Sequence, residues 1–170
     1  MTNEKGRKQV TILGVNADST SKDGVLRNIR SKIGKGEKFF IVTPNPEQVL
    51  IARGDREYRE ILNSADISVP DGIGLIAAAK FYSLPRPKSF IRRALTFFVQ
   101  GLGVGFSVLS DRNWLETELK LIKGREIFTD LIGIAGKKGW SVVLLGDAAG
   151  SAQKAARKLT ENYFNLKVTA

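Results

Sequence analysis

The sequence contains no cysteine and no histidine. The absence of cysteine excludes a disulfide framework and any metal site built from thiolates, and it is compatible with a reducing cytoplasm. The absence of histidine excludes Ser-His and Cys-His catalysis and removes the commonest metal ligand. A general base in this chain must therefore be the side chain of an aspartate, a glutamate, a lysine or a tyrosine.

Two familiar sequence patterns are also missing. The first ten residues, MTNEKGRKQV, lack the apolar core of a signal peptide. A dinucleotide-binding domain would carry G-x-G-x-x-G after its first strand, and this sequence has ILGVNADS there instead. This difference argues against a dinucleotide oxidoreductase.

What the sequence does contain is an excess of basic residues, with a formal net charge of +10 over 170 residues. Such a charge favours an anionic partner, either a nucleic acid, an anionic lipid or a phosphorylated substrate. The alternative is a soluble protein with a basic surface and no specific partner. The length and the hydrophobic fraction of 42% are sufficient for a single domain, residues 1–170, with a real core.

Short apolar runs alternate with amphipathic segments along the chain, which predicts an α/β fold. Because strands and helices alternate, we expect a mostly parallel sheet with helices on both faces. Buried strands are expected at residues 10–15, 39–43, 67–69 and 141–146, and a further strand at residues 165–169. Helices are expected between residues 20 and 36, from Pro46, from Asp55 to Ala65, at residues 75–81 and 114–122, and after Gly150.

Two loops stand out because each follows an expected buried strand and precedes an expected helix. The first is TPNPEQ, residues 43–48, in which Asn45 fits an N-cap, Pro46 the first helical position and Gln48 the partner in a capping box. The second is PDGIG, residues 70–74. In open α/β sheets this edge is where ligands bind. By spacing alone, TPNPEQ is equally readable as a well-made helix start, and for Asp71 of PDGIG the capping preference favours a helix cap.

Asp71 is the carboxylate best placed for chemistry. Gly72 and Gly74 follow it, and glycines let the backbone turn sharply and a substrate approach closely. Asp71 is either a general base or the N-cap of the helix that follows. A second glycine turn, from Gly146 to Gly150, is a weaker candidate for a phosphate cradle, because its spacing matches neither standard phosphate-binding motif.

Residues 80–109 break the alternating pattern. Five basic residues and no acidic one occur in residues 80–93, and residues 94–109 then carry no charge. The uncharged run of 16 residues is shorter than the roughly 20 that a spanning helix needs. We expect residues 85–109 to lie in a membrane interface. The alternatives are a buried hairpin and an oligomer contact.

Four segments together resemble the WecG/TagA/CpsF glycosyltransferases: TPNPEQVLIA, ADISVPDGIGLIAAA, GREIFTDLI and VVLLGDAAGSAQKAARKL. TPNPE followed by PDGIG is a specific pair. The resemblance covers roughly residues 10–79 and 124–170. Residues 83–123 between them resemble an insertion found in some members.

The resemblance implies a Rossmann-like fold and an inverting transfer without a cofactor. The substrate is an N-acetylhexosamine, often N-acetylmannosamine, which moves from a UDP-sugar to a polyprenyl-diphosphate-linked N-acetylglucosamine. The products enter wall teichoic acid, enterobacterial common antigen or capsule synthesis. The implied location is cytoplasmic, on the inner face of the cell membrane.

The resemblance also assigns roles to individual residues. Asp71 is the expected base, and Thr43 and Asn45 line the same pocket. Arg125, with Asp130, corresponds to the arginine ahead of a glycine-x-aspartate, although Phe128 stands where the glycine is usual. Gly72, Gly74 and Gly146 are further expected substrate-binding residues.

The chain differs from many nucleotide-sugar enzymes in one respect and from the family that it resembles in another, and both differences affect the expected chemistry. Many nucleotide-sugar enzymes hold a metal with an Asp-x-Asp motif, and none occurs here. We therefore expect a metal-independent site in which Arg125 and helix N-termini stabilise the leaving UDP. The family also continues with a glycine-rich segment and a basic appendage that are absent here, so we expect this chain alone to be weakly active or inactive.

Other function classes remain open at this point. A basic nucleic-acid-binding domain would use the same charge, but the basic residues adjoin a long apolar run instead of interleaved aromatics, so we expect no nucleic-acid partner. A non-catalytic scaffold is compatible with the missing C-terminal part. Homo-oligomers are a further expectation for this chain.

Overall fold

The computed structural model describes residues 7–170 and divides the chain into two compact units, one ending at Gly124 and one from Arg125 to Ala170. Each unit has its own apolar cluster. Mixed α/β structure is confirmed. The described strands form three two-stranded sheets, which differs from the single, mostly parallel sheet expected from the sequence. The division into one domain with an insertion at residues 83–123 stays a prediction.

The first unit opens with a β-hairpin where the sequence predicted one strand at residues 10–15. Strands β1 (Gln9–Ile12) and β2 (Val15–Asp18) are antiparallel, with Ile12 opposite Val15. The two residues between them, Leu13 and Gly14, have φ angles of 49° and 89°. Positive φ at both positions is the geometry of a tight hairpin turn that follows the twist of the strands. The single-strand prediction is therefore wrong, because the chain reverses within the apolar run.

Helix α1 (Lys22–Gly34) follows the hairpin and confirms the helix that was expected between residues 20 and 36. The Ser21 hydroxyl accepts a hydrogen bond from the Gly24 N–H and caps the helix. Val25, Leu26 and Ile29 are buried on one face. This spacing of apolar residues is typical of a helix with one buried face.

The centre of the first unit is a short parallel pair, β3 (Ile41–Val42) and β4 (Ile67–Ser68), with Ile41 opposite Ile67. Helices α2 (Pro46–Gly54) and α3 (Arg56–Ser64) connect the two strands. Asp55 caps α3 by accepting a hydrogen bond from the Tyr58 N–H, as predicted. Both strands occur where expected, and both are shorter. Ile61 on α3 is 47% exposed.

Helix α4 (Ile73–Ser83) leaves the end of β4 and packs against α5 (Phe90–Ser110) and α6 (Arg112–Leu115). The shared core of the first unit joins the hairpin, α2, α3, α4 and the residues after α6. Its buried members are Ile12, Val15, Ala17, Val42, Val49, Ala52, Leu62, Ala65, Leu75, Ile76, Ala79, Val104, Leu115 and Leu119.

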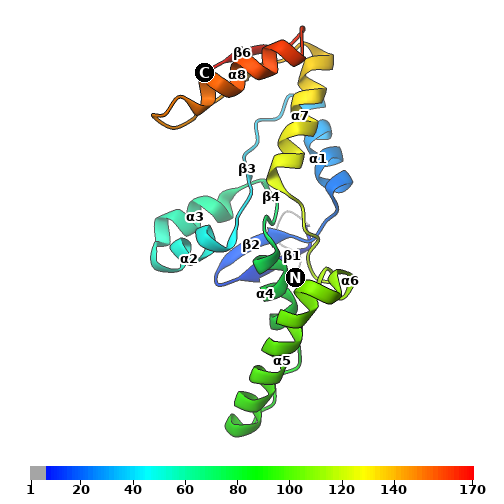
Figure 1. The fold of residues 1–170 in the computed structure, drawn as a ribbon, viewed down its shortest axis with the longest axis vertical. Helices are drawn as coiled ribbons and strands as arrows, with labels where there is room; N and C mark the ends of the chain where they lie inside the picture. Colours follow the sequence, from blue (N-terminus) through cyan, green and yellow to red (C-terminus); the bar gives the residue numbers. More distant parts are fainter. Residues whose placement is uncertain (1–6) are drawn as a thin grey trace. The chain divides into compact units, whose positions relative to one another are not determined.

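Helix α5 is one continuous helix of 21 residues, and Figure 1 shows it extending away from the hairpin and the β3–β4 pair. The expected alternative of a buried hairpin is wrong, because only Val104 of this helix is buried. Among residues 7–170, α5 is the one helix long and apolar enough to cross a membrane by length and composition. Three interior glycines weaken it by roughly 1 kcal/mol each relative to alanine, and they do not break it.

The segment after α5 differs from its prediction. A helix was expected at residues 114–122, but α6 ends at Leu115. Leu115, Leu119 and Ile122 are nevertheless all buried. One turn followed by an irregular segment buries the same three side chains that a longer helix would bury.

Lys80 does not belong to the exposed basic group beside the apolar run. Its side chain is buried, donates a hydrogen bond of 2.9 Å to the Thr117 hydroxyl, and lies 4.4 Å from the centre of the Trp114 ring. The other four basic residues of residues 80–93 are exposed, namely Arg86, Lys88, Arg92 and Arg93.

The second unit contains α7 (Gly124–Lys138), which starts at the last residue of the first unit, then β5 (Ser141–Val143), α8 (Ser151–Asn162) and β6 (Lys167–Thr169). Strands β5 and β6 are parallel. Ile132, Ala135 and Leu166 form its buried cluster. The expected buried strand at residues 141–146 is exposed on its outer side, where Val143 is 71% exposed. Val142 packs on the cluster, whereas its neighbour faces outward, because alternate residues of a strand point to opposite faces.

The fold makes a direct prediction for two leucines near α6. Leu115 is fully buried, whereas Leu109 is 88% exposed. Leu115→Ala is expected to lower the free energy of unfolding by about 2–5 kcal/mol, because it leaves a cavity in the core. Leu109→Ala, the same chemical change, should leave it nearly unchanged. Urea unfolding followed by circular dichroism measures both, and equal losses would contradict this packing.

Candidate active site

The TPNPEQ and PDGIG loops lie side by side at one end of the β3–β4 pair. The Val69 N–H donates to the Val42 carbonyl at 2.8 Å, and the Asp71 N–H donates to the Pro44 carbonyl at 2.9 Å. These two bonds continue the parallel pairing past the strands and into the loops. Parallel strands place their carboxyl ends at one edge of a sheet, which is where α/β proteins bind ligands.

The first loop ends in a closed capping box at the start of α2. The Asn45 side-chain oxygen accepts from the Gln48 N–H at 2.9 Å, and the Gln48 side-chain oxygen accepts from the Asn45 N–H at 3.1 Å. Pro46 occupies the first turn. This confirms the predicted helix start. It also means that the side-chain oxygen of Asn45 is engaged, so that its amide NH2 is the group left to contact a ligand.

The second loop packs closely against the first through its glycines. Gly72 has a φ of 98° and a ψ of 135°, a conformation that side chains disfavour. A Cβ atom on Gly72 would lie 3.1 Å from Pro46 Cδ, and one on Gly74 would lie 2.9 Å from Pro46 Cγ. The glycines therefore permit both the turn and the close contact of the two loops.

The side chain of Asp71 does not cap α4. The N-cap of α4 is Gly72, and no side chain caps this helix. The Asp71 carboxylate instead accepts a hydrogen bond of 3.3 Å at Oδ2 from the Gly124 N–H. The alternative interpretation of Asp71 as an N-cap is therefore wrong, and its carboxylate is held by a residue 53 positions away.

Thr43 lies at the same place. A Cβ atom on Gly124 would be 3.2 Å from Asp71 Oδ2 and 3.2 Å from Thr43 Cγ2. Asp71 and Thr43 are both half-buried, so that the carboxylate is neither sealed in the core nor fully in solvent. Gly124 was not among the predicted site residues. The only sequence signal for it is its position directly before Arg125, in the GREIFTDLI segment.

The structure places the other predicted residues in the second unit. Arg125 and Asp130 are on α7, with Arg125 exposed and Asp130 half-buried. Gly146 lies between β5 and α8, and a Cβ atom there would be 2.8 Å from the Ser151 hydroxyl oxygen. Their predicted roles in substrate binding stay predictions.

The glycine turn before α8 is closed by its own aspartate. Asp147 Oδ1 accepts from the Ala149 N–H at 3.1 Å and from the Ser151 N–H at 3.3 Å. Hydrogen bonds from the Ser151 side chain and backbone, and from Ala149, hold the pKa of the Asp147 carboxyl below its usual value. A phosphate group at this turn would have to displace that carboxylate.

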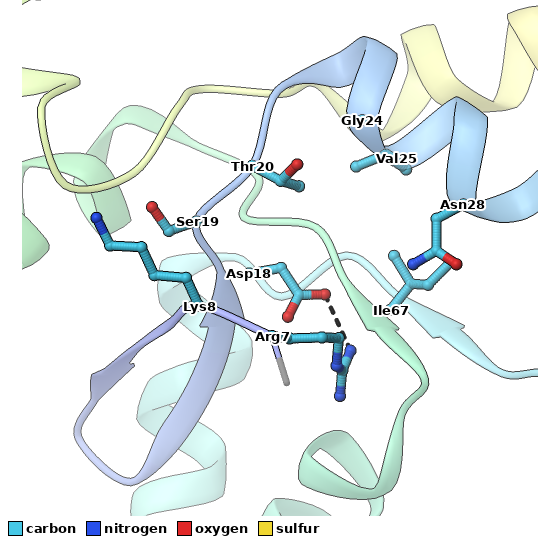
Figure 2. Close-up of a pocket in the computed structure, with 9 residues that line it drawn as sticks. All are labelled: Arg7, Lys8, Asp18, Ser19, Thr20, Gly24, Val25, Asn28 and Ile67. Carbon is cyan, nitrogen blue, oxygen red and sulfur yellow. Dashed lines mark hydrogen bonds and ion pairs between the residues drawn. The ribbon is translucent and has the colours of Figure 1, made fainter. Parts of the chain in front are cut away.

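A separate cavity of about 180 Å³ lies between the end of β2, α1 and β4 (Figure 2). Asp18 is buried there and accepts from the Arg7 guanidinium at 3.0 Å, from the Gln9 amide at 2.7 Å and from the Ser68 N–H at 2.9 Å. Figure 2 shows the Asp18 carboxylate turned toward Arg7, whereas Lys8 extends away from it. Three donors satisfy this carboxylate, so its role is to fasten the hairpin to β4. No motif in the sequence marks Asp18.

Within residues 7–170, no cluster of three or more metal-ligating side chains is placed to hold a metal ion. Metal independence stays a prediction.

A model of the glycosyl transferase WecG/TagA/CpsF family matches residues 10–96, about half of the chain. The chain belongs to this family. The matched part of this WecG/TagA/CpsF member contains both loops of the candidate site, whereas Arg125, Asp130 and Gly146 lie outside it. The family resemblance of the two loop motifs is thereby confirmed.

Two relatives of this family member carry the name N-acetylglucosaminyldiphosphoundecaprenol N-acetyl-beta-D-mannosaminyltransferase. The protein from Bacillus subtilis (strain 168) is 26% identical over 140 residues, which are 82% of this chain and 41% of that protein. The protein from Staphylococcus aureus (strain NCTC 8325 / PS 47) is 37% identical over 73 residues, which are 42% of this chain and 29% of that protein. The chain spans less than half the length of these curated relatives.

Alanine substitutions at two glycines, one in the PDGIG loop and one inside α5, are expected to change the stability of the fold in opposite directions. Gly72→Ala is expected to destabilise the fold by about 1–3 kcal/mol, because alanine disfavours this backbone conformation and its Cβ would crowd Pro46. Gly103→Ala, inside α5 with nothing within 4 Å of the new Cβ, should stabilise by up to about 1 kcal/mol. Chemical unfolding compares the two variants. A Gly72→Ala protein as stable as the wild type would contradict the loop geometry.

Proposed function

We propose that this chain acts in an inverting glycosyl transfer, with Asp71 as the base. The transferred group is an N-acetylhexosamine, and N-acetylmannosamine is the hexosamine that we propose. It moves from a UDP-sugar to a polyprenyl-diphosphate-linked N-acetylglucosamine in cell-surface polysaccharide synthesis. Family membership and the names of the relatives support this assignment. The observation that carries it is the half-buried Asp71 carboxylate beside Thr43, at the end of two parallel strands.

The geometry supports a single-displacement reaction. The Gly124 N–H holds Oδ2 of Asp71, and within residues 7–170 no hydrogen bond engages Oδ1. Oδ1 takes the proton from the acceptor hydroxyl as that oxygen bonds to the anomeric carbon. The bond from that carbon to the UDP oxygen breaks on the opposite face, so that UDP leaves and the configuration inverts. Thr43 and the Asn45 amide line the sugar pocket, and Gly72 and Gly74 contact the sugar through their backbone atoms.

The departing UDP carries negative charge that positive groups must stabilise. Of the two helices that begin at this edge, α2 has a side-chain cap and α4 has none. The first N–H groups of α4 are therefore the better partners for a phosphate oxygen. Arg125 is the proposed cationic partner, with Asp130 and Gly146 in supporting roles, and this part of the proposal rests on the family resemblance. The Rossmann-like architecture is proposed on the same ground.

Asp71→Asn is expected to lower transfer by about 100-fold or more, because an amide cannot accept the proton. UDP binding should change little, since the shape of the side chain is kept. The assay follows sugar transfer from several UDP-N-acetylhexosamines to a lipid-diphosphate acceptor, with and without EDTA. Asp23→Asn, on the exposed first turn of α1, is the matched control. Wild-type turnover by the Asp71 variant would remove it from the mechanism, and loss of activity in EDTA would contradict a metal-independent site.

We also propose that the protein works on the inner face of the cell membrane and binds it through residues 85–109. Phe98 and Phe106 on α5 are 66% and 70% exposed. Phe98→Gln/Phe106→Gln is expected to weaken sedimentation with anionic liposomes by at least about tenfold, because two apolar side chains no longer enter the lipid. Ile51→Gln/Ile61→Gln changes two exposed isoleucines elsewhere and serves as control.

The same variants separate a lipid contact from a contact between two copies of the chain. Sedimentation velocity without lipid reports the oligomeric state. A dimer that dissociates in the phenylalanine variant, with no binding to liposomes by the wild type, would assign this surface to self-association.

A further inference from the structure

The first turns of α5 and the segment before it form an exposed tip of the first unit. The Phe97 ring packs edge-on against Phe81 at 5.6 Å, near the end of α4, and Val104 enters the core. The Gln100 amide donates to the Pro85 carbonyl at 3.0 Å, which ties the preceding segment to the helix. Residues 85–96 therefore have a defined arrangement on the fold.

This tip contains an open hollow of about 410 Å³ with an unusual lining. Its walls are the apolar residues Phe90, Ala94 and Phe97, together with the side chains of Arg86 and Arg93. Arg86 lies 5.5 Å from the centre of the Tyr82 ring, and Arg93 lies 6.0 Å from that of Phe90. Within the described part of the chain, neither guanidinium group takes part in an ion pair or a hydrogen bond.

The charge around the hollow is of one sign. No acidic residue occurs between Asp71 and Asp111 in the sequence. Arg86 and Arg93 bring two positive charges to a hollow whose exposed lining is almost wholly apolar, and arginine matches the geometry of phosphate oxygens better than lysine does. The hollow is thus complementary to a phosphate group that is attached to hydrocarbon.

A stripe of apolar side chains runs along α5 from this hollow. Its members recur every three or four residues, so they share one face of the helix, and each is at least 60% exposed. They are Ile91, Leu95, Phe98, Leu102, Phe106 and Leu109. Because the opposite face packs on α4 through Phe97 and Val104, α5 is oriented to lie along a surface, and a crossing of the bilayer would pull Val104 from the core.

We propose that the Arg86–Arg93 hollow binds the phosphate of an anionic membrane phospholipid while the stripe lies among the acyl chains. This inference rests on the membrane-binding part of the proposed function. The hollow is at the far end of α4 from Asp71, and the 11 residues of that helix span about 16 Å. The bound phosphate is therefore an anchor for the protein and is distinct from the sugar acceptor at Asp71.

The test compares two charge-matched double variants of the full chain. Arg86→Gln/Arg93→Gln removes both guanidinium groups of the hollow, and Lys88→Gln/Arg92→Gln removes two charges of the same segment outside it. Co-sedimentation is measured at fixed ionic strength with phosphatidylcholine vesicles, with and without phosphatidylglycerol. Circular dichroism confirms that both variants keep the wild-type helix content.

Diffuse attraction to an anionic surface is expected to fall about fivefold for each basic charge removed, equally in both variants. The Arg86/Arg93 variant should lose about a further tenfold on phosphatidylglycerol vesicles, because it also loses direct hydrogen bonds to phosphate. Equal losses in the two variants, or wild-type binding that does not depend on phosphatidylglycerol, would overturn the proposal.

A parallel assay keeps this result separate from the transferase proposal. Transfer to a short-chain, water-soluble acceptor should be the same for the wild type and the Arg86/Arg93 variant. Absence of transfer in every protein would count against the proposed reaction, while the vesicle comparison would still decide on the hollow.

Discussion

The hydrogen bond from the Asp71 N–H to the Pro44 carbonyl is the constraint on which the candidate site depends. Strands β3 and β4 are only two residues long, so the strands alone give little support to the loops beyond them. Pro44 and Pro70 are fully buried at the start of the two loops. A proline cannot donate to a ladder but can still accept, so the backbone pairing ends in one defined register. That register sets Asp71 beside Thr43.

Gly72 in one loop and the Asn45 cap in the other have different effects on the site. Gly72 turns the chain so that α4 begins without a side-chain cap, which leaves the Asp71 side chain free to point elsewhere. The Gly124 N–H then fixes one carboxylate oxygen. By contrast, Asn45 uses its oxygen to close α2. Two loops that look alike in sequence therefore have different chemical tasks, one as the start of a closed helix and one as the carrier of an oriented carboxylate.

Local rules account for the features that the sequence predicted well. The capping box at Asn45, the cap at Asp55 and the buried face of α1 depend on residues within a few positions of one another. The failures have non-local or backbone causes. The Leu13-Gly14 turn lacks the common Asn-Gly signal. The exposure of one side of β5 depends on which strands and helices pack on it. The partner of Asp71, Gly124, is 53 positions away along the chain. The family motifs identified Asp71, but its hydrogen bond to Gly124 follows only from the folded chain.

Lys80 explains why α5 presents one particular face. Its ammonium group, between Thr117 and Trp114, ties α4 to the segment after α5, and Leu115 and Leu119 bury the same segment in the core. The segments before and after α5 are thus both attached to α4, which limits rotation of α5 about its axis. A helix with fixed rotation keeps its apolar stripe on one side and Arg86 and Arg93 together at one end. The buried lysine, which in the sequence looked like part of the membrane-binding charge, instead sets the geometry in which the four exposed basic residues are presented.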